Sequence, residues 1–254
     1  FFGGDLQGII DHLDYLQDLG ITGLYLCPIF ESPSNHKYNT TDYFEINRHF
    51  GDKKIFRKLV EGAHQRGMKI MLDAVFNHIG DQSPQWQDVL KHGEKSEYKD
   101  WFHVQEFPVT KDKLGNPRKL PYHTFAFASY MPKLNTANPQ VRDYLLSVAT
   151  YWIEEFDIDA WRLDVANEVD HQFWRDFHKA VLAKKPDLYI LGEVWHTSQP
   201  WLNGDEFHAV MNYPLSDSIK DYFLRGTKKT PQFIDEINSQ SMYYRQQISE
   251  VMFN

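Results

Sequence analysis

Three segments of the chain place charged or polar side chains where an apolar run ends. Burying such groups is costly unless they are paired or functional. Two carboxylates that face one pocket allow one to attack a substrate while the other donates and removes a proton. The segments are DAVFNH (73–78), with Asp73, Asn77 and His78; DAWRLDV (159–165), with Arg162 and Asp164; and LYILGEV (188–194), with Glu193.

Asp164 and Glu193 are the candidate pair, because each lies at the end of a predicted strand and the two strands follow one another. Arg162 lies on the same side of its strand as Asp164, and we expect it to keep that carboxylate ionised. The alternative is a structural ion pair with Glu193 as a buried anchor, but three such strands together favour function. His78 alone is a weaker candidate, and Asp73 is predicted to be structural.

The elements that must position these residues alternate between apolar strands and amphipathic helices. This pattern predicts an α/β fold with a parallel sheet and outer helices. The spacing indicates an incomplete (β/α)8 TIM barrel with about six strands, the first and last strands being absent. Predicted helices are 5–19, 52–66, 139–155, 170–184, 215–224 and 231–246, and predicted strands are 21–30, 68–76, 159–165, 188–194, 208–213 and one that opens at Val251.

Residues 79–133 interrupt this rhythm with an aromatic, proline-containing stretch. We therefore expect one partial catalytic barrel domain, 1–254, with an inserted subdomain at 79–133. The chain starts at Phe1 and stops within an apolar run, so we expect it to be a fragment of a longer protein.

Composition narrows the classes of partner. A net charge of −8 without a basic cluster argues against nucleic acid or an anionic membrane as the main partner. The single cysteine, Cys27, excludes an internal disulfide and a cysteine-based zinc site. Aromatic residues make up 15% of the chain, enough to present flat apolar faces to a ligand as well as to fill a core.

Several motifs resemble those of the α-amylase superfamily of glycoside hydrolases (family 13). DAVFNH (73–78), WRLDVANEV (161–169) and GEVW (192–195) look like three of its sequence regions, and MPKLN (131–135) resembles a region typical of the neopullulanase, cyclomaltodextrinase and maltogenic amylase group. Residues 21–30, 32–46 and 211–215 are similar to the same group. The resemblance runs in order through essentially the whole chain.

The resemblance implies a role for each matching residue. Asp164 is the nucleophile, Glu193 the general acid/base, and Arg162 orients and ionises Asp164. Phe125 is the least secure assignment, because it fits the core of the inserted subdomain equally well. The implied substrate contacts are His78 and Tyr38 before the scissile bond, with Tyr38 stacking; Asn167 and Glu168, where related α-amylases carry Lys-His, on the acceptor side; and Trp195 and Phe125, stacking on neighbouring sugars.

No cofactor is required by this chemistry, and no His-x-His or cysteine cluster indicates a catalytic metal. The resemblance allows a structural calcium bound by the Gly3 carbonyl and Asp5. An equally good interpretation makes Asp5 the N-cap of a helix.

The resemblance implies retaining hydrolysis of α-1,4 and also α-1,6 glucosidic bonds in cyclodextrins, pullulan or starch oligosaccharides, with transglycosylation. An oligo-1,6-glucosidase is the first alternative, but its region typically reads QPDLN, not MPKLN. An inactive carbohydrate-binding barrel is the second, although such proteins tend to lose the nucleophile or the acid. We expect a cytoplasmic homodimer, with secretion left open. The family's third carboxylate has no match in 1–254, so this chain alone is expected to be inactive.

Overall fold

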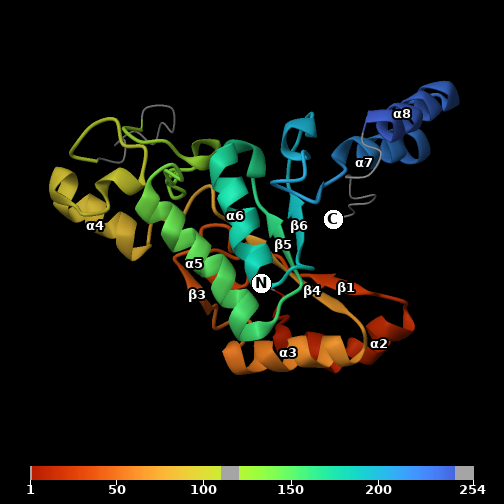
Figure 1. Ribbon diagram of the computed structural model, residues 1–254, viewed down its shortest axis with the longest axis horizontal. Coiled ribbons are helices and arrows are strands. Elements are labelled where there is room, and N and C mark those ends of the chain that lie inside the picture. Colours follow the sequence, from red (N-terminus) through yellow and green to blue (C-terminus); the bar gives the residue numbers. More distant parts are fainter. Residues whose placement is uncertain (1, 110–119, 244–254) are drawn as a thin grey trace.

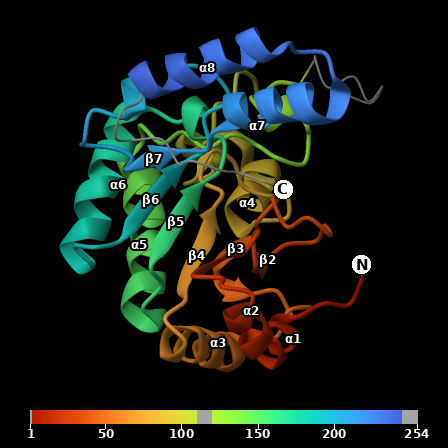
Figure 2. The same cartoon turned by 90° about the vertical axis from the view of Figure 1, so that its right-hand side faces the viewer.

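The fold, taken from a computed structural model that describes residues 2–109 and 120–243, is built on five parallel strands in the order β1-β4-β5-β6-β7 (Figures 1 and 2). This confirms the predicted parallel sheet, and the expected sixth strand at Val251 lies outside the described residues. The strands are shorter than predicted: β1 (Gly23–Tyr25), β4 (Lys69–Ala74), β5 (Ala160–Leu163), β6 (Tyr189–Gly192) and β7 (Ala209–Val210).

The strand register brings the candidate residues to one edge of the sheet. Asp73 of β4 lies opposite Arg162 of β5, and Leu163 lies opposite Gly192 of β6. Asp164 and Glu193 each follow the last residue of their strand, so both emerge at the carboxyl ends of adjacent parallel strands.

The N-terminal helical prediction was partly wrong. Residues 5–19 form two short helices, α1 (Leu6–Asp11) and α2 (Leu13–Asp18), because His12 leaves the helical conformation with φ −112° and ψ 8°.

The next helix, α3 (Lys53–Gln65), agrees with its prediction: Asp52 caps it by accepting a hydrogen bond from the Ile55 amide. Its buried stripe of Phe56, Leu59, Val60 and Ala63 faces the sheet.

Helices α5 (Pro139–Phe156) and α6 (His171–Lys184) cover the outer face of the sheet and pack on each other (Figure 2). Proline at the first position of α5 and the Asn138 cap fix its start. At the other end of the chain, α7 (Tyr213–Ile219), the π-helical η7 (Lys220–Arg225) and α8 (Thr230–Tyr243) lie beyond the carboxyl ends of the strands.

The described part of the segment between β4 and α5 holds α4 (Pro84–His92) and the short 3-10 turns η1 (Gly93–Lys95), η2 (Lys99–Trp101) and η4 (Phe125–Phe127). Isolated antiparallel bridges tie it together, among them Val104 to Tyr122 and His78 to Lys133. Its division from the barrel as a subdomain stays a prediction. A second sheet, in which β2 (Phe30–Glu31) pairs with β3 (Asp42–Ile46), was not predicted.

One continuous core joins the sheet to the outer helices and is rich in aromatic rings. Trp152 of α5 is fully buried, stacks on Phe156 and donates its indole N–H to the Tyr43 carbonyl. Large buried rings leave little freedom for the strands, so the strand ends form a rigid base for the site. Within the described residues, no helix combines the length and the apolar character needed to cross a membrane.

Candidate active site

Arg162 is the centre of the candidate site and binds three carboxylates. Its Nη1 lies 2.9 Å from both carboxylate oxygens of Asp73 and 2.7 Å from Oδ1 of Asp164, and its Nη2 lies 2.8 Å from Oε1 of Glu193. All four side chains are at most 7% exposed. Asp164 and Glu193 therefore face each other across one guanidinium group, as the strand order predicted.

Glu193 has two further hydrogen-bond donors. The Val165 amide donates to Oε2 at 2.9 Å, and the Tyr213 hydroxyl donates to Oε1 at 2.7 Å. Tyr213 was not among the predicted site residues. It lies in the segment MNYPL (211–215), which resembles the family, but only the fold shows that α7 begins beside the end of β6.

Gly192, the residue before Glu193, lies too close to Phe207 to carry a side chain. An added Cβ at Gly192 would lie 2.3 Å from the ring of Phe207, which is itself buried. A side chain at this position would push the end of β6 away from the segment that leads into β7. Gly192 therefore helps to set where the Glu193 carboxylate begins.

Asp73 binds Arg162 and two tyrosine hydroxyls, which agrees with its predicted structural role. Two tyrosine hydroxyls donate to its Oδ2, from Tyr25 at 2.5 Å and from Tyr38 at 3.0 Å. Tyr25 was also missed, although a tyrosine inside a short apolar strand suggests a hydrogen-bonding role. Tyr38 contacts the guanidinium of Arg162 as well, with its ring centre 6.0 Å away.

The carboxylates influence each other strongly. Burial raises the pKa of Asp164 well above its usual range, the Asp73 and Glu193 charges add to this, and Arg162 acts in the opposite direction. Burial likewise raises the pKa of Asp73 against the effect of Arg162 and the tyrosine hydroxyls. The expected pairing of Arg162 with Asp164 is present, and it lowers the pKa of that carboxyl against burial and the neighbouring carboxylates, which raise it.

His78 is fully buried, and its ring is held from three sides. Its Nε2–H donates to the Tyr38 carbonyl at 2.9 Å, the Asn77 amide lies 3.3 Å from Nδ1, and the ring stacks on Phe125 at 4.9 Å. Burial lowers the pKa of His78 to about 4, so the ring is neutral at neutral pH. His78 thus connects the Tyr38 loop to Phe125, and direct contact with a sugar stays a prediction.

The other predicted contacts surround the carboxylates. Trp195 is 63% exposed and meets the edge of Tyr213. Asn167 is half-buried, and Glu168 is exposed. The Glu168 carbonyl accepts a hydrogen bond from Nζ of Lys133, a residue of the MPKLN motif, at 2.9 Å, and this Nζ also contacts Oδ1 of Asn77. The motif thus ties the segment before α5 to the loop after β5.

The calcium expectation receives no support from the residues near the start of the chain. Asp5 caps α1, accepting a hydrogen bond from the Gly8 amide at 2.8 Å, which is the alternative interpretation. Residues 2–109 and 120–243 contain no group of three or more His, Cys, Asp or Glu side chains placed to hold a metal. Calcium takes about six to eight oxygen ligands, so Gly3 and Asp5 would supply only part of its ligand set, and the calcium site stays a prediction.

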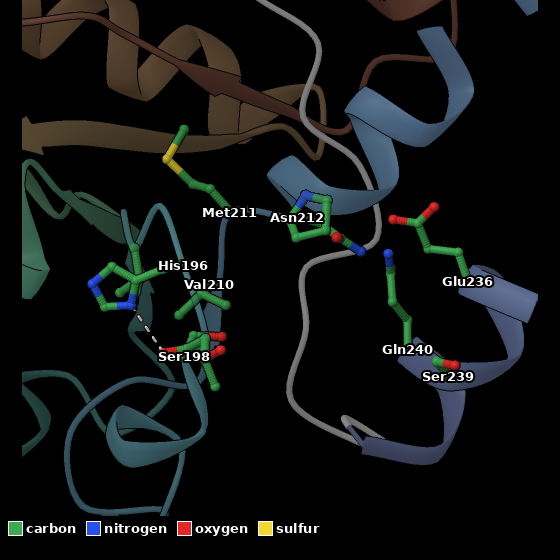
Figure 3. Close-up of a pocket in the computed structure, with 11 residues that line it drawn as sticks. His196, Ser198, Val210, Met211, Asn212, Glu236, Ser239 and Gln240 are labelled. Atoms are coloured by element: carbon green, nitrogen blue, oxygen red, sulfur yellow. Dashed lines mark hydrogen bonds between the residues drawn. The ribbon is translucent and has the colours of Figure 1, made fainter. Parts of the chain in front are cut away.

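Two cavities flank the carboxylates. One, of 460 Å³, includes Tyr25, Cys27, His36 and Tyr38. The other, of 380 Å³, has His196 and Ser198 on one side and Glu236 and Gln240 of α8 on the other (Figure 3). Met211 lines this second cavity and places its sulfur 3.4 Å from Nε of Arg162, so the cavity adjoins the site without containing either candidate catalytic carboxylate.

Fold and site together define a class: a parallel α/β barrel domain, incomplete here, with a buried pair of carboxylates at its strand ends and one arginine between them. The family model described as the alpha amylase catalytic domain matches residues 2–254. The chain belongs to the alpha-amylase family.

Curated relatives and solved structures agree with this assignment. An intracellular maltogenic amylase of Bacillus subtilis is 61% identical over the whole chain, and neopullulanase 2 of Thermoactinomyces vulgaris is 51% identical. The chain covers 42% and 43% of these proteins, less than half of either. The solved structure of a cyclomaltodextrinase matches this chain with TM-score 0.93 and 53% identity. The match covers all of this chain and 43% of the cyclomaltodextrinase chain.

A second solved structure, a cyclic α-maltosyl-(1→6)-maltose hydrolase from Arthrobacter globiformis, covers 98% of this chain and 55% of its own, with TM-score 0.90 and 42% identity.

Proposed function

We propose that the protein carrying this chain is a retaining glycoside hydrolase that cleaves α-1,4, and also α-1,6, glucosidic bonds in cyclodextrins, pullulan or starch oligosaccharides. The observation that carries the proposal is the pairing of Asp164 and Glu193 on adjacent strands across Arg162. Retaining enzymes hold their two carboxyl groups about 5–5.5 Å apart. Two carboxylates that share one guanidinium support a separation on that scale.

The residues divide the reaction between them. Asp164 attacks C1 of the sugar while Glu193 gives its proton to the glycosidic oxygen, so the C1–O bond breaks and a covalent glycosyl-enzyme forms. Glu193 then takes a proton from water, which attacks C1 and releases Asp164. A sugar acceptor in place of water gives transglycosylation. Tyr38 and Trp195 offer aromatic faces on which neighbouring sugar rings stack.

The names of the relatives support the substrate class. They include a maltogenic amylase, cyclomaltodextrinases, a neopullulanase and a hydrolase of a cyclic maltosyl-maltose. The presence of both Asp164 and Glu193 disfavours an inactive binding barrel. We propose a cytoplasmic location because one relative is named an intracellular maltogenic amylase. We propose a homodimer from the family resemblance alone, and the mass of the full-length protein in solution tests it.

Product analysis with the full-length protein tests the proposal. The anomer released from maltooligosaccharides, followed by NMR in the first minutes, should be α, because two successive inversions at C1 retain configuration. Release of the β anomer would refute the retaining mechanism. Comparing products from cyclodextrin, pullulan and starch identifies the preferred substrate. Residues 1–254 alone should show negligible hydrolysis.

A further inference from the structure

Val165, the residue after Asp164, has an unusual backbone. Its φ is +46° and its ψ +41°, in the left-handed region that a β-branched side chain adopts only under strain. Four other non-glycine residues within 2–109 and 120–243 share a positive φ, but they are Lys37, Ala126, Phe127 and Asp157, none of them β-branched. The strain therefore lies directly between the nucleophile and the next turn, η5 (Ala166–Glu168).

This conformation turns two successive amides toward Glu193. The Val165 N–H donates to Oε2 of the carboxylate at 2.9 Å, and the Ala166 N–H donates to the Glu193 carbonyl at 3.1 Å. The φ angle of Val165 sets the relative orientation of these two peptide planes. With an ordinary negative φ, the two amides would point in different directions and could not both bind the same residue.

The surroundings hold Val165 in this conformation. Before it, the Asp164 amide donates to the Ala74 carbonyl at 3.0 Å, which anchors the end of β5 to β4. After it, the Ala166 carbonyl accepts the indole N–H of fully buried Trp174 at 2.9 Å. Backbone strain persists where fixed contacts on both sides leave the chain no alternative, and it clusters at sites where geometry matters.

Both oxygens of Glu193 have fixed partners. The Val165 amide binds Oε2 at 2.9 Å, while Oε1 lies 2.7 Å from the Tyr213 hydroxyl and 2.8 Å from Nη2 of Arg162. Partners on both oxygens fix the plane of the carboxylate, and the Val165 amide is the partner that comes from the residue next to Asp164.

We propose that Val165 is a positioning residue: its strained backbone fixes the Glu193 carboxylate relative to Asp164. The inference rests on the proposed glycoside hydrolase function. It assigns the role to the backbone conformation at position 165, not to the isopropyl side chain.

Stability comparisons in the full-length protein test the strain. The variants are Val165→Ala and Val165→Gly, with Ala149→Gly in the middle of α5 as control for the same alanine-to-glycine change. The control should lower the thermal midpoint relative to wild type, because glycine weakens a helix interior. At position 165 the glycine variant should melt higher than the alanine variant, since only glycine adopts a positive φ freely. A lower midpoint for Val165→Gly than for Val165→Ala would show that the position is not strained and overturn the proposal.

Kinetics test the positioning. Relative to Val165→Ala, Val165→Gly should lower kcat by about tenfold, as expected for one weakened hydrogen bond, with KM little changed. Val165→Asn, whose side chain tolerates a positive φ, should keep kcat close to that of Val165→Ala. Coincident kcat and KM values for the alanine and glycine variants would leave position 165 with packing alone. A wild-type protein inactive on α-glucans would refute the proposed function, while the midpoints would still report the strain.

Discussion

Replacing Arg162 by methionine should destabilise the protein severely, because one guanidinium is the shared ion-pair partner of three buried carboxylates. The cation contacts Asp73, Asp164 and Glu193 at 2.7–2.9 Å, and methionine keeps much of its apolar stem without the charge. Removing one partner of a buried ion pair costs about 3–5 kcal/mol. Here three carboxylates lose their cation together, so we expect the loss to reach at least the upper part of this range.

The pH dependence of the stability lost in Arg162→Met shows whether the cause is electrostatic. Burial raises the pKa of Asp73 and of Asp164 in the folded protein, and removing Arg162 raises both further. Groups with a raised pKa bind more protons in the folded than in the unfolded state, so their effect favours the fold at low pH and is lost as pH rises. The deficit of the variant should therefore be largest near pH 7 and narrow steadily toward pH 5.

The assay is the thermal midpoint of the full-length protein at several pH values. Each kcal/mol shifts the midpoint by about 2–4 °C in a domain of this size, so Arg162→Met should lower it by roughly 10 °C or more at pH 7. Adding Asp73→Asn to this variant should restore part of the loss, because one uncompensated charge disappears. The control is Arg225→Met, which removes an exposed pair with Asp221 and should leave the midpoint almost unchanged.

A deficit for Arg162→Met as small as that of the control, or one that does not change between pH 7 and pH 5, would refute the electrostatic reasoning. A double variant less stable than Arg162→Met alone would show that Asp73 acts through its own hydrogen bonds with the tyrosines more than through its charge.

Three further predictions concern individual residues. Asp164→Asn should keep the fold and lower turnover by several orders of magnitude, measured as reducing ends released from cyclodextrin; substantial remaining activity would end the nucleophile assignment. Tyr38→Ala should raise KM and lower kcat with little change in thermal midpoint, whereas a large fall in midpoint with unchanged kinetics would assign the ring to the core. Gly192→Ala should lower both midpoint and kcat, because the added Cβ meets Phe207 at 2.3 Å; a crystal structure of an unchanged, fully active variant would contradict this.

Much of the architecture followed from the sequence alone. The alternation of apolar strands with amphipathic helices predicted the parallel sheet, because strands buried on both faces need continuous apolar runs. Helices α3, α5 and α6 begin and end within one residue of their predicted bounds. The single helix expected over 5–19 was wrong at His12, where the chain departs from helical angles although the apolar spacing continues.

The sequence also predicted Arg162, Asp164 and Glu193 as candidate site residues, because a charged residue at the end of an apolar strand is costly unless it is paired or functional. The hydrogen-bond partners of these residues came only from the tertiary structure. Tyr25 and Tyr213 lie on β1 and α7, far from the motifs they serve, and their hydroxyls reach Asp73 and Glu193 only once the strands are assembled.

The tertiary structure likewise decided the electrostatic surroundings of Asp164 and the backbone of Val165. Sequence spacing predicted the pairing of Arg162 with Asp164, but burial and the carboxylates that converge from β4 and β6 raise the pKa of Asp164, and neither can be seen along one strand. A valine carries no local signal for a positive φ. Its conformation is imposed by contacts on both sides, which is why only the fold could reveal it.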